Sequence, residues 1–129
     1  MKTLKGNTIK HVITLSILLI FSFLISGCAD QPKPLYIYGN YSQSYYTYKN
    51  KPSIKSKQSL EKSIKYAINH SNKSSSKRVA PGMYANLGYI YLKSGNRSKA
   101  IENFEKEKLI YPESTFLMDK MIKEIEEIK

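Results

Sequence analysis

The only cysteine of this 129-residue chain, Cys28, is the residue whose position says most about its chemistry. It lies in "FLISGCADQP", directly after an apolar run from Val12 to Ile25, which itself follows the lysine-containing, acid-free start "MKTLKGNTIKH". A single thiol excludes a disulfide within the chain. The apolar run is shorter than the roughly 20 residues that a membrane-spanning helix needs, and small residues follow it. The first 27 residues are therefore predicted to be a signal peptide.

The residues around the predicted cleavage site, Leu24-Ile25-Ser26-Gly27-Cys28, resemble the bacterial lipobox, in which an aliphatic residue and two small residues precede a cysteine. The resemblance implies that the Cys28 thiol receives a diacylglyceryl group and that cleavage frees its amine for a further chain. One acyl chain holds a protein only marginally at a membrane, whereas two or three anchor it stably. Two alternatives stay open: a chance cysteine at the end of an uncleaved anchor helix, and a free thiol in a secreted protein.

The mature chain, residues 28–129, would be a small basic domain. Its 102 residues suffice for one modest core. The whole chain has a net charge of +11, and loss of the leader, which holds three of the 21 basic residues and no acid, leaves +8. Export excludes ordinary intracellular nucleic acid as a partner, so the charge is expected to face anionic lipid headgroups, wall polymers or an acidic protein surface. A solvated lysine-rich surface is the alternative.

The types and positions of the titratable residues give no indication of catalysis. The mature chain has one histidine, His70, which is expected at a helix end, where the helix dipole favours a cation. Of the ten acidic residues only Asp30 and Glu61 precede residue 102, and the others are spaced with lysines as on a solvated helix face. Phosphate-binding glycine loops and Cys/His metal motifs are also missing from the sequence. We therefore expect a protein that is not an enzyme, with no cofactor, metal or small-molecule substrate.

A tyrosine-rich segment follows a short spacer at residues 29–34, which can reach roughly 23 Å from Cys28. The run "LYIYG" and the turn signal Gly39-Asn40 predict a hairpin or an irregular extended arm, so residues 28–58 are interpreted as an arm and linker. Three interpretations of the tyrosines are open: packing on helices downstream, docking of a protein or sugar polymer, or insertion at the membrane headgroups. The tyrosines concerned are Tyr36, Tyr38, Tyr41, Tyr45, Tyr46 and Tyr48.

Beyond this arm the apolar spacing becomes helical. Leu60, Ile64, Ala67 and Ile68 fall on one face of a helix predicted from Ser59 to about Asn69. A polar stretch, "HSNKSSSKRVAPG", then interrupts the pattern and predicts a loop.

Residues 81–114 have the pattern of a tetratricopeptide repeat, a 34-residue helix-turn-helix. The pattern requires small residues where its two helices cross, larger ones around the crossing, a glycine in the turn and a proline at the end. Glu107 departs from it, because the family prefers a small residue there, and we expect it to loosen the packing or to face outward. The matching positions are Tyr84, Leu87, Gly88, Tyr91, Gly95, Ala100, Phe104 and Pro112.

A last helix is predicted from about Ser114 to Ile128 as a cap, with an apolar stripe of Phe116 or Leu117, Met121, Ile125 and Ile128. Residues 59–129 are therefore expected to form an all-α domain, a tetratricopeptide-like helical hairpin with flanking helices, preceded by the Tyr-rich extended arm. A protein partner would bind the concave side of the hairpin, where Asn86, Tyr89 and Lys93 are expected.

The lipobox, the segment "LYIYGNYSQSYYTYK" and the ending "AIENFEKEKLIYPESTFLMDKMI" together resemble an uncharacterised family of small bacterial lipoproteins. Its members are typically found alongside lipoproteins similar to the curli export channel, which implies a place in an envelope assembly. Ala29 after Cys28 resembles the sorting rule for the outer membrane, facing the periplasm. We expect a lipid-anchored accessory or scaffold that binds an envelope protein. The alternative is a structural lipoprotein that binds an anionic polymer or membrane surface through residues 49–78.

Overall fold

The computed structural model describes residues 9–17 and 32–127. Residues 9–17 form a helix in a first compact unit, and residues 33–129 belong to a second. Within the described residues, no helix has the length and apolar character needed to cross a membrane. Cys28 and the predicted cleavage site lie outside the described residues.

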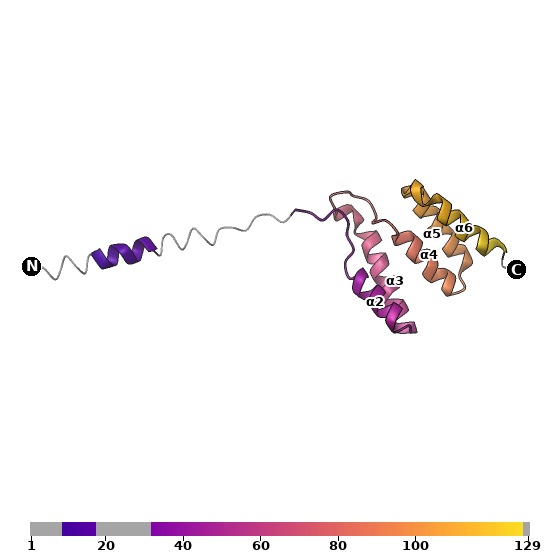
Figure 1. The fold of residues 1–129 in the computed structure, drawn as a ribbon, viewed down its shortest axis with the longest axis horizontal. Coiled ribbons are helices and arrows are strands. Elements are labelled where there is room, and N and C mark those ends of the chain that lie inside the picture. The colour runs from indigo at the N-terminus through magenta and orange to yellow at the C-terminus, as the bar shows by residue number, and fades with distance from the viewer. Residues whose placement is uncertain (1–8, 18–31, 128–129) are drawn as a thin grey trace, which may run out of the picture. The chain divides into compact units, whose positions relative to one another are not determined.

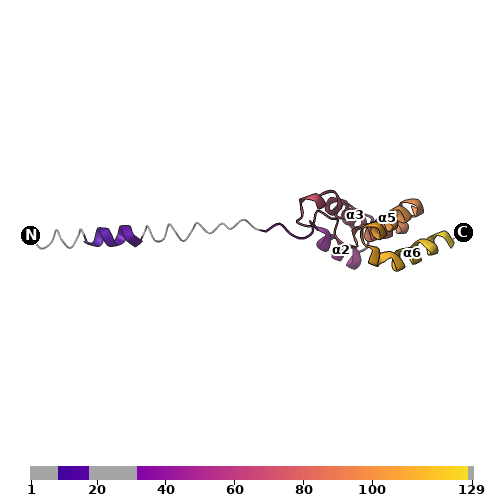
Figure 2. The same cartoon turned by 90° about the horizontal axis from the view of Figure 1, so that it is seen from above.

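The second unit is a row of helices in which each helix packs on the next one in the chain, and the described residues contain no strand. Helices α2 and α3 lie at one end of the row and α5 and α6 at the other, with α4 between them (Figures 1 and 2). The predicted all-α class is confirmed. The bounds are α2 Tyr41–Asn50, α3 Ile54–Asn69, α4 Met83–Lys93, α5 Arg97–Ile110 and α6 Thr115–Glu127.

The predicted extended arm is wrong from Tyr41 onward, because this part of the Tyr-rich segment is helix α2. Tyr41, Ser44 and Tyr48 are its buried or half-buried residues, at i, i+3 and i+7, so the burial follows the helical period. Gly39, with a φ of +53°, precedes this helix and does not join two strands. The β-preference of tyrosine is thus overridden by packing against α3.

Helix α3 begins at Ile54, five residues before its predicted start, because Ser53 and Ser56 form a capping box. The Ser53 hydroxyl accepts from the Ser56 amide at 3.0 Å, and the Ser56 hydroxyl accepts from the Ser53 amide at 2.9 Å. Such caps satisfy amides that the first helical turn leaves without carbonyl partners. Leu60, Ile64 and Ala67 are buried on one face of α3, as predicted, and Ile68, predicted on the same face, is half-buried.

The α4–α5 hairpin turns at Gly95, whose φ of +75° places it in the left-handed region. The Asn96 amide donates to the Tyr91 carbonyl and the Gly95 amide to the Leu92 carbonyl, both at 2.9 Å. This is the Schellman arrangement that glycine favours at a helix end. Asn96 then caps α5 by accepting from the Lys99 amide at 3.1 Å. The predicted turn is confirmed.

Two hydrophobic clusters stabilise the row. The first joins Leu60 and Ile64 of α3 to Met83 and Ile90 of α4, and Tyr36, Tyr41 and Tyr48 pack against it. The second joins Ala100 and Phe104 of α5 to Met118, Ile122 and Ile125 of α6. Tyr91 packs against both clusters, so α4 connects the two halves.

The stripe predicted for α6 is only partly correct. Ile125 is buried and Met121 half-buried, but the stripe begins at Met118, and Phe116 and Leu117 are 84% and 56% exposed. Residues 118, 122 and 125 share a face at the helical period, and positions 116 and 117 fall outside it. Ile128 lies outside the described residues.

Candidate functional site

The predicted docking tyrosines divide into two sets. Tyr36, Tyr41 and Tyr48 pack against the first cluster, whereas Tyr38, Tyr45 and Tyr46 are exposed. The rings follow one another in space: Tyr36 and Tyr38 have centroids 6.4 Å apart, as do Tyr38 and Tyr41, and Tyr41 lies 5.8 Å from Tyr45. Burial, followed by the neighbouring Tyr45 and Tyr38, raises the pKa of Tyr41. Three of these tyrosines therefore pack against the core, and the other three are exposed to solvent.

The start of the domain is fixed to the serine-rich loop before α4. The Ser75 amide donates to the Pro34 carbonyl at 2.9 Å, and the Ser76 amide donates to the Leu35 carbonyl at 3.3 Å. These bonds join residues more than 40 positions apart. Residues 34 and 35 are therefore held against this loop.

A second attachment lies beside this loop, at the buried side chain of Tyr111. Its hydroxyl donates to the Val79 carbonyl, and the Arg78 guanidinium lies 4.8 Å above its ring and donates to the Ile110 carbonyl. Burial first, and hydrogen bonding with Tyr36 second, raise the pKa of Tyr111 to about 12. The end of α5 is thereby joined to the loop before α4.

Glu107 was expected to loosen the packing or to face outward, and the outward position is wrong. Its side chain is 3% exposed and accepts hydrogen bonds from the amides of Gly82, at 2.7 Å, and Ala85, at 3.2 Å. These amides belong to the start of α4, where a helix has free donors and favours an anion. The departure from the repeat pattern thus supplies the N-terminal cap that Gly82, lacking a side chain, cannot.

The three residues predicted to bind a partner, Asn86, Tyr89 and Lys93, do share one face of α4. The Asn86 amide group donates to the Gly82 carbonyl at 2.7 Å, which partly occupies it. Tyr89 is 43% exposed, and the Lys93 ammonium lies 5.3 Å from the centre of its ring. This face is polar and solvated.

A better-formed site lies on a different side of α4. It is a groove of about 430 Å³ between α3 and α5, which we call the α3–α5 groove. Ile68 of α3 and Leu87 of α4 contribute apolar surface, and Tyr84 and Tyr91 of α4 contribute their rings. Its volume is within the range of about 300–1,000 Å³ that is usual for ligand sites.

Three lysines line this groove, and each has its ammonium near a tyrosine ring. Lys65 of α3 and Lys99 of α5 lie 5.7 Å and 5.3 Å from the centre of the Tyr91 ring, and Lys106 lies 5.9 Å from that of Tyr84. At these distances the negative face of an aromatic ring attracts a cation. The groove is therefore lined by tyrosine rings from α4 and is cationic overall, with three lysines against Glu102.

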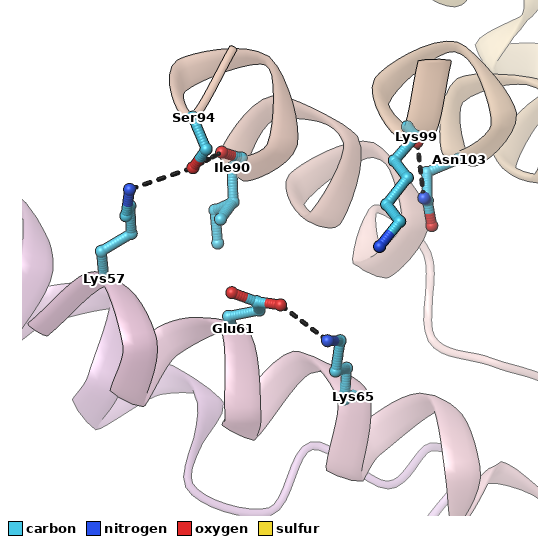
Figure 3. A network of polar contacts seen from close by, with 7 residues as sticks. All are labelled: Lys57, Glu61, Lys65, Ile90, Ser94, Lys99 and Asn103. Atoms are coloured by element: carbon cyan, nitrogen blue, oxygen red, sulfur yellow. Dashed lines mark hydrogen bonds and ion pairs between the residues drawn. The ribbon is translucent and has the colours of Figure 1, made fainter. Parts of the chain in front are cut away.

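Two of these lysines are paired with acids on their own helices. Lys65 binds Glu61 at 2.6 Å and Lys106 binds Glu102 at 2.6 Å, and these hydrogen bonds are the main cause of the raised pKa of each lysine. Figure 3 shows the Glu61–Lys65 pair on α3 opposite Lys99 on α5. Both paired lysines stay charged at neutral pH.

Polar contacts fix the two walls of the groove. The Lys57 ammonium donates to the Ser94 hydroxyl at 3.0 Å, and that hydroxyl donates to the Ile90 carbonyl at 2.8 Å, which ties α3 to the end of α4 (Figure 3). Asn103 is 5% exposed and donates to the Lys99 carbonyl at 2.7 Å. The first contact thus holds α3 against α4, and the second, which lies within α5, fixes the Asn103 side chain.

Part of this groove could have been predicted from the spacing of tyrosines and lysines, which the repeat pattern does not consider. Tyr84 and Tyr91 are seven residues apart on α4, and Lys99 and Lys106 are seven apart on α5. Because the two helices run antiparallel across a tight turn, equal spacing places one lysine near each ring. Lys65, on a helix outside the repeat, could not be added from this spacing.

Another pocket, of about 480 Å³, lies between α2 and α3 and is lined by residues that include Ser44, Ser63 and Tyr66. The Ser44 hydroxyl is sealed from solvent and has no hydrogen-bond partner in the described part of the chain. Among the same residues no group of three His, Cys, Asp or Glu side chains is placed to hold a metal ion. His70 lies at the end of α3 as predicted, with its ring stacked on that of Tyr66 at 4.0 Å.

Comparison with known proteins places the chain in a family. No curated protein and no solved structure matches it. A family model described as a domain of unknown function, DUF4810, matches residues 35–121. The match starts at the segment attached to the serine-rich loop, includes α2 to α5 and the whole α3–α5 groove, and ends within α6. The chain therefore belongs to the DUF4810 family.

Proposed function

We propose that this protein is a lipid-anchored helical adaptor that holds a partner protein close to a membrane of the bacterial envelope. The observation that supports the proposal is the α3–α5 groove, which has an apolar floor at Ile68 and Leu87 and is lined by tyrosine rings and lysines. The anchor is acylated Cys28, for which the signal peptide and lipobox-like residues are the support. Residues 29–32 would then separate the anchor from the start of the domain.

The composition of the groove suits a protein partner. Tyrosine supplies large contact area at low entropic cost, and aromatic residues are enriched where proteins bind one another. The floor at Ile68 and Leu87 can receive an apolar side chain, while the exposed Asn69 offers an amide group on the α3 side of the groove. A partner segment that combines apolar and polar side chains would use all of these.

The architecture also favours an adaptor. The α4–α5 hairpin has a tight crossing and a glycine turn, which support our proposal that it is a tetratricopeptide-like repeat, and such repeats commonly provide binding surfaces by stacking helices in rows. Exposed Phe116 and Leu117 on the last helix leave apolar surface at that end of the row. We propose an accessory or scaffold role in an envelope assembly or export complex, on the outer membrane, with Ala29 after Cys28 as the support for that location.

Site-specific photocrosslinking in the native envelope tests this proposal. A photoreactive amino acid at Asn69, on the wall of the groove, is expected to give an adduct with one defined protein. The same amino acid at Tyr89, on the other face of α4, serves as the control and should not give that adduct. Loss of the adduct in Cys28→Ser would support the anchored form. Equal adducts from both positions, or none from Asn69, would contradict an adaptor that uses the groove.

A second candidate function has one observation in its favour. Residues 49–78 contain nine lysines or arginines and a single acid, Glu61. An anionic envelope polymer or membrane surface would bind this segment with strong salt dependence. Lys55→Gln with Lys62→Gln, two exposed positions on α3, should then weaken binding to vesicles that contain anionic lipid. Vesicle binding that is insensitive to both salt and this double substitution would exclude this alternative.

A further inference from the structure

We infer that the α3–α5 groove recognises an acidic segment of the partner protein, with one carboxylate seated beside Tyr91 between Lys65 and Lys99. This inference rests on the proposed adaptor function and states the chemistry of its partner. It begins from the two ammonium groups that lie near the same ring, one from α3 and one from α5. Like charges brought together by two different helices favour an anion between them.

The two lysines are not equivalent, and the difference indicates where the anion would bind. Lys65 is already paired with Glu61 on its own helix. Lys99 forms no ion pair with any carboxylate in the described part of the chain, and its ammonium lies beside the Tyr91 ring. The pKa of Glu102 is lowered mainly by its hydrogen bond with Lys106 and, to a minor extent, by the charge of Lys99. In Figure 3 its side chain extends from α5 toward α3, on the side where Lys65 lies. A carboxylate bound there would form an ion pair with Lys99 and would also be attracted by the charge of Lys65.

The rest of the groove favours an acidic peptide over a densely charged polymer. Ile68 and Leu87 form an apolar floor that a chain of phosphates cannot use. Glu102, on the same groove, would repel a polymer that carries a charge at every unit. A peptide can place one carboxylate near Lys99 and an apolar side chain on the floor, so it can use both the charge and the apolar surface of the groove.

The chain provides a matched pair of lysines for the test. Lys99 and Lys93 are both exposed, and each ammonium lies 5.3 Å from the centre of a tyrosine ring, Tyr91 and Tyr89 respectively. Only Lys99 lines the groove. Charge reversal at each position therefore changes the net charge equally and separates a groove effect from a general electrostatic one.

The experiment measures fluorescence anisotropy of a labelled peptide of Glu, Leu, Gly and Ser as the full chain, held in detergent micelles, is added. The same peptide with Gln in place of Glu is the chemical control. Lys99→Glu is expected to weaken binding of the Glu peptide about tenfold or more, and Lys93→Glu less than about twofold. Binding of the Gln peptide should be weaker than that of the Glu peptide and unaffected by either change.

Equal losses from Lys99→Glu and Lys93→Glu would overturn the inference, as would equal binding of the two peptides or no binding of the Glu peptide. An acidic polymer such as polyphosphate that competes with the Glu peptide and depends on Lys99 to the same extent would also overturn it. These outcomes are distinguishable from failure of the adaptor itself. If the Asn69 adduct forms while the peptide test fails, the groove binds a protein by other chemistry. If the adduct does not form, the proposed adaptor function itself is wrong, whatever the peptide test shows.

Discussion

Gly88 of α4 lies so close to Phe104 of α5 that a Cβ at position 88 would stand 2.6 Å from Cε1 and 2.8 Å from Cδ1 of the ring. The Ala100 carbonyl oxygen would be 3.0 Å away on the same side. Real Cβ atoms do not approach a ring and a backbone oxygen this closely at once. The hairpin can therefore keep this close crossing only if residue 88 has no side chain, and a methyl group there would force the Phe104 ring or the helices to shift.

Gly88→Ala is expected to lower the free energy of unfolding by about 1–3 kcal/mol, the usual cost of overfilling a packed core. The change opposes helix propensity, which favours alanine over glycine by about 1 kcal/mol inside a helix. The sign of the change in unfolding free energy therefore shows whether steric crowding or helix propensity dominates. Thermal unfolding followed by far-UV circular dichroism measures it.

A double substitution separates crowding from any other cause. If the methyl group collides with the Phe104 ring, Gly88→Ala combined with Phe104→Leu should cost less than the sum of the two single changes. Strictly additive costs would contradict the contact as the source of the destabilisation.

This hairpin was the part of the fold that the sequence predicted best. The glycine at 88, the alanine at 100 and the phenylalanine at 104 are spaced so that only a close crossing of two helices explains all three residue types. The contacts are local, joining helices separated by one tight turn, and local contacts leave periodic patterns in the sequence. The turn at Gly95 was predictable for the same reason.

The features that the sequence did not predict depend on long-range contacts or on residue types with mixed preferences. Glu107 looks like a solvated helix position, because its partners Gly82 and Ala85 lie more than 20 residues away. Helix α2 was missed because tyrosines favour strands and because Ser44, at the centre of its buried face, is small and polar. The α3–α5 groove needs Lys65 from a helix outside the repeat, and no pattern within the repeat could supply it.

Glu107→Ala should destabilise the protein by about 1–3 kcal/mol, because it leaves the amides of Gly82 and Ala85 without their acceptor in a partly buried position. Glu105→Ala, at an exposed neighbour on α5, is the control and should change stability by less than about 0.5 kcal/mol. Urea unfolding of both variants compares them. Equal effects would show that Glu107 does not act through the start of α4.

Ser44→Ala is expected to leave the protein as stable as before or to stabilise it. The Ser44 hydroxyl is buried between α2 and α3 without a partner, and an unpaired buried polar group costs about 1–3 kcal/mol. Ser56→Ala should have the opposite effect, a loss of about 1 kcal/mol, because it removes the capping box of α3. Melting temperatures of the two variants, measured side by side, test this. If Ser44→Ala lost as much stability as Ser56→Ala, the prediction for Ser44 would be wrong.

Tyr111→Phe should lower stability at neutral pH by about 1 kcal/mol, since the Val79 carbonyl loses its hydrogen-bond donor. The ring and its contact with Arg78 are kept, so the loss reports the hydroxyl alone. The variant also tests the alkaline behaviour of the fold. In the native protein, burial and then Tyr36 raise the pKa of Tyr111 to about 12, above the value of about 10 expected in the unfolded chain.

The sign of the pH effect follows from this shift. Between pH 10 and 12 the unfolded chain has already released the Tyr111 proton, and the folded chain still holds it, so folding becomes less favourable as the pH rises. The stabilisation is complete below the unfolded pKa and is lost as the pH passes the folded one. Lysines also titrate in this interval, so the informative quantity is the difference between wild type and Tyr111→Phe. That difference should shrink with rising pH, and a constant gap would mean that Tyr111 titrates alike in both states.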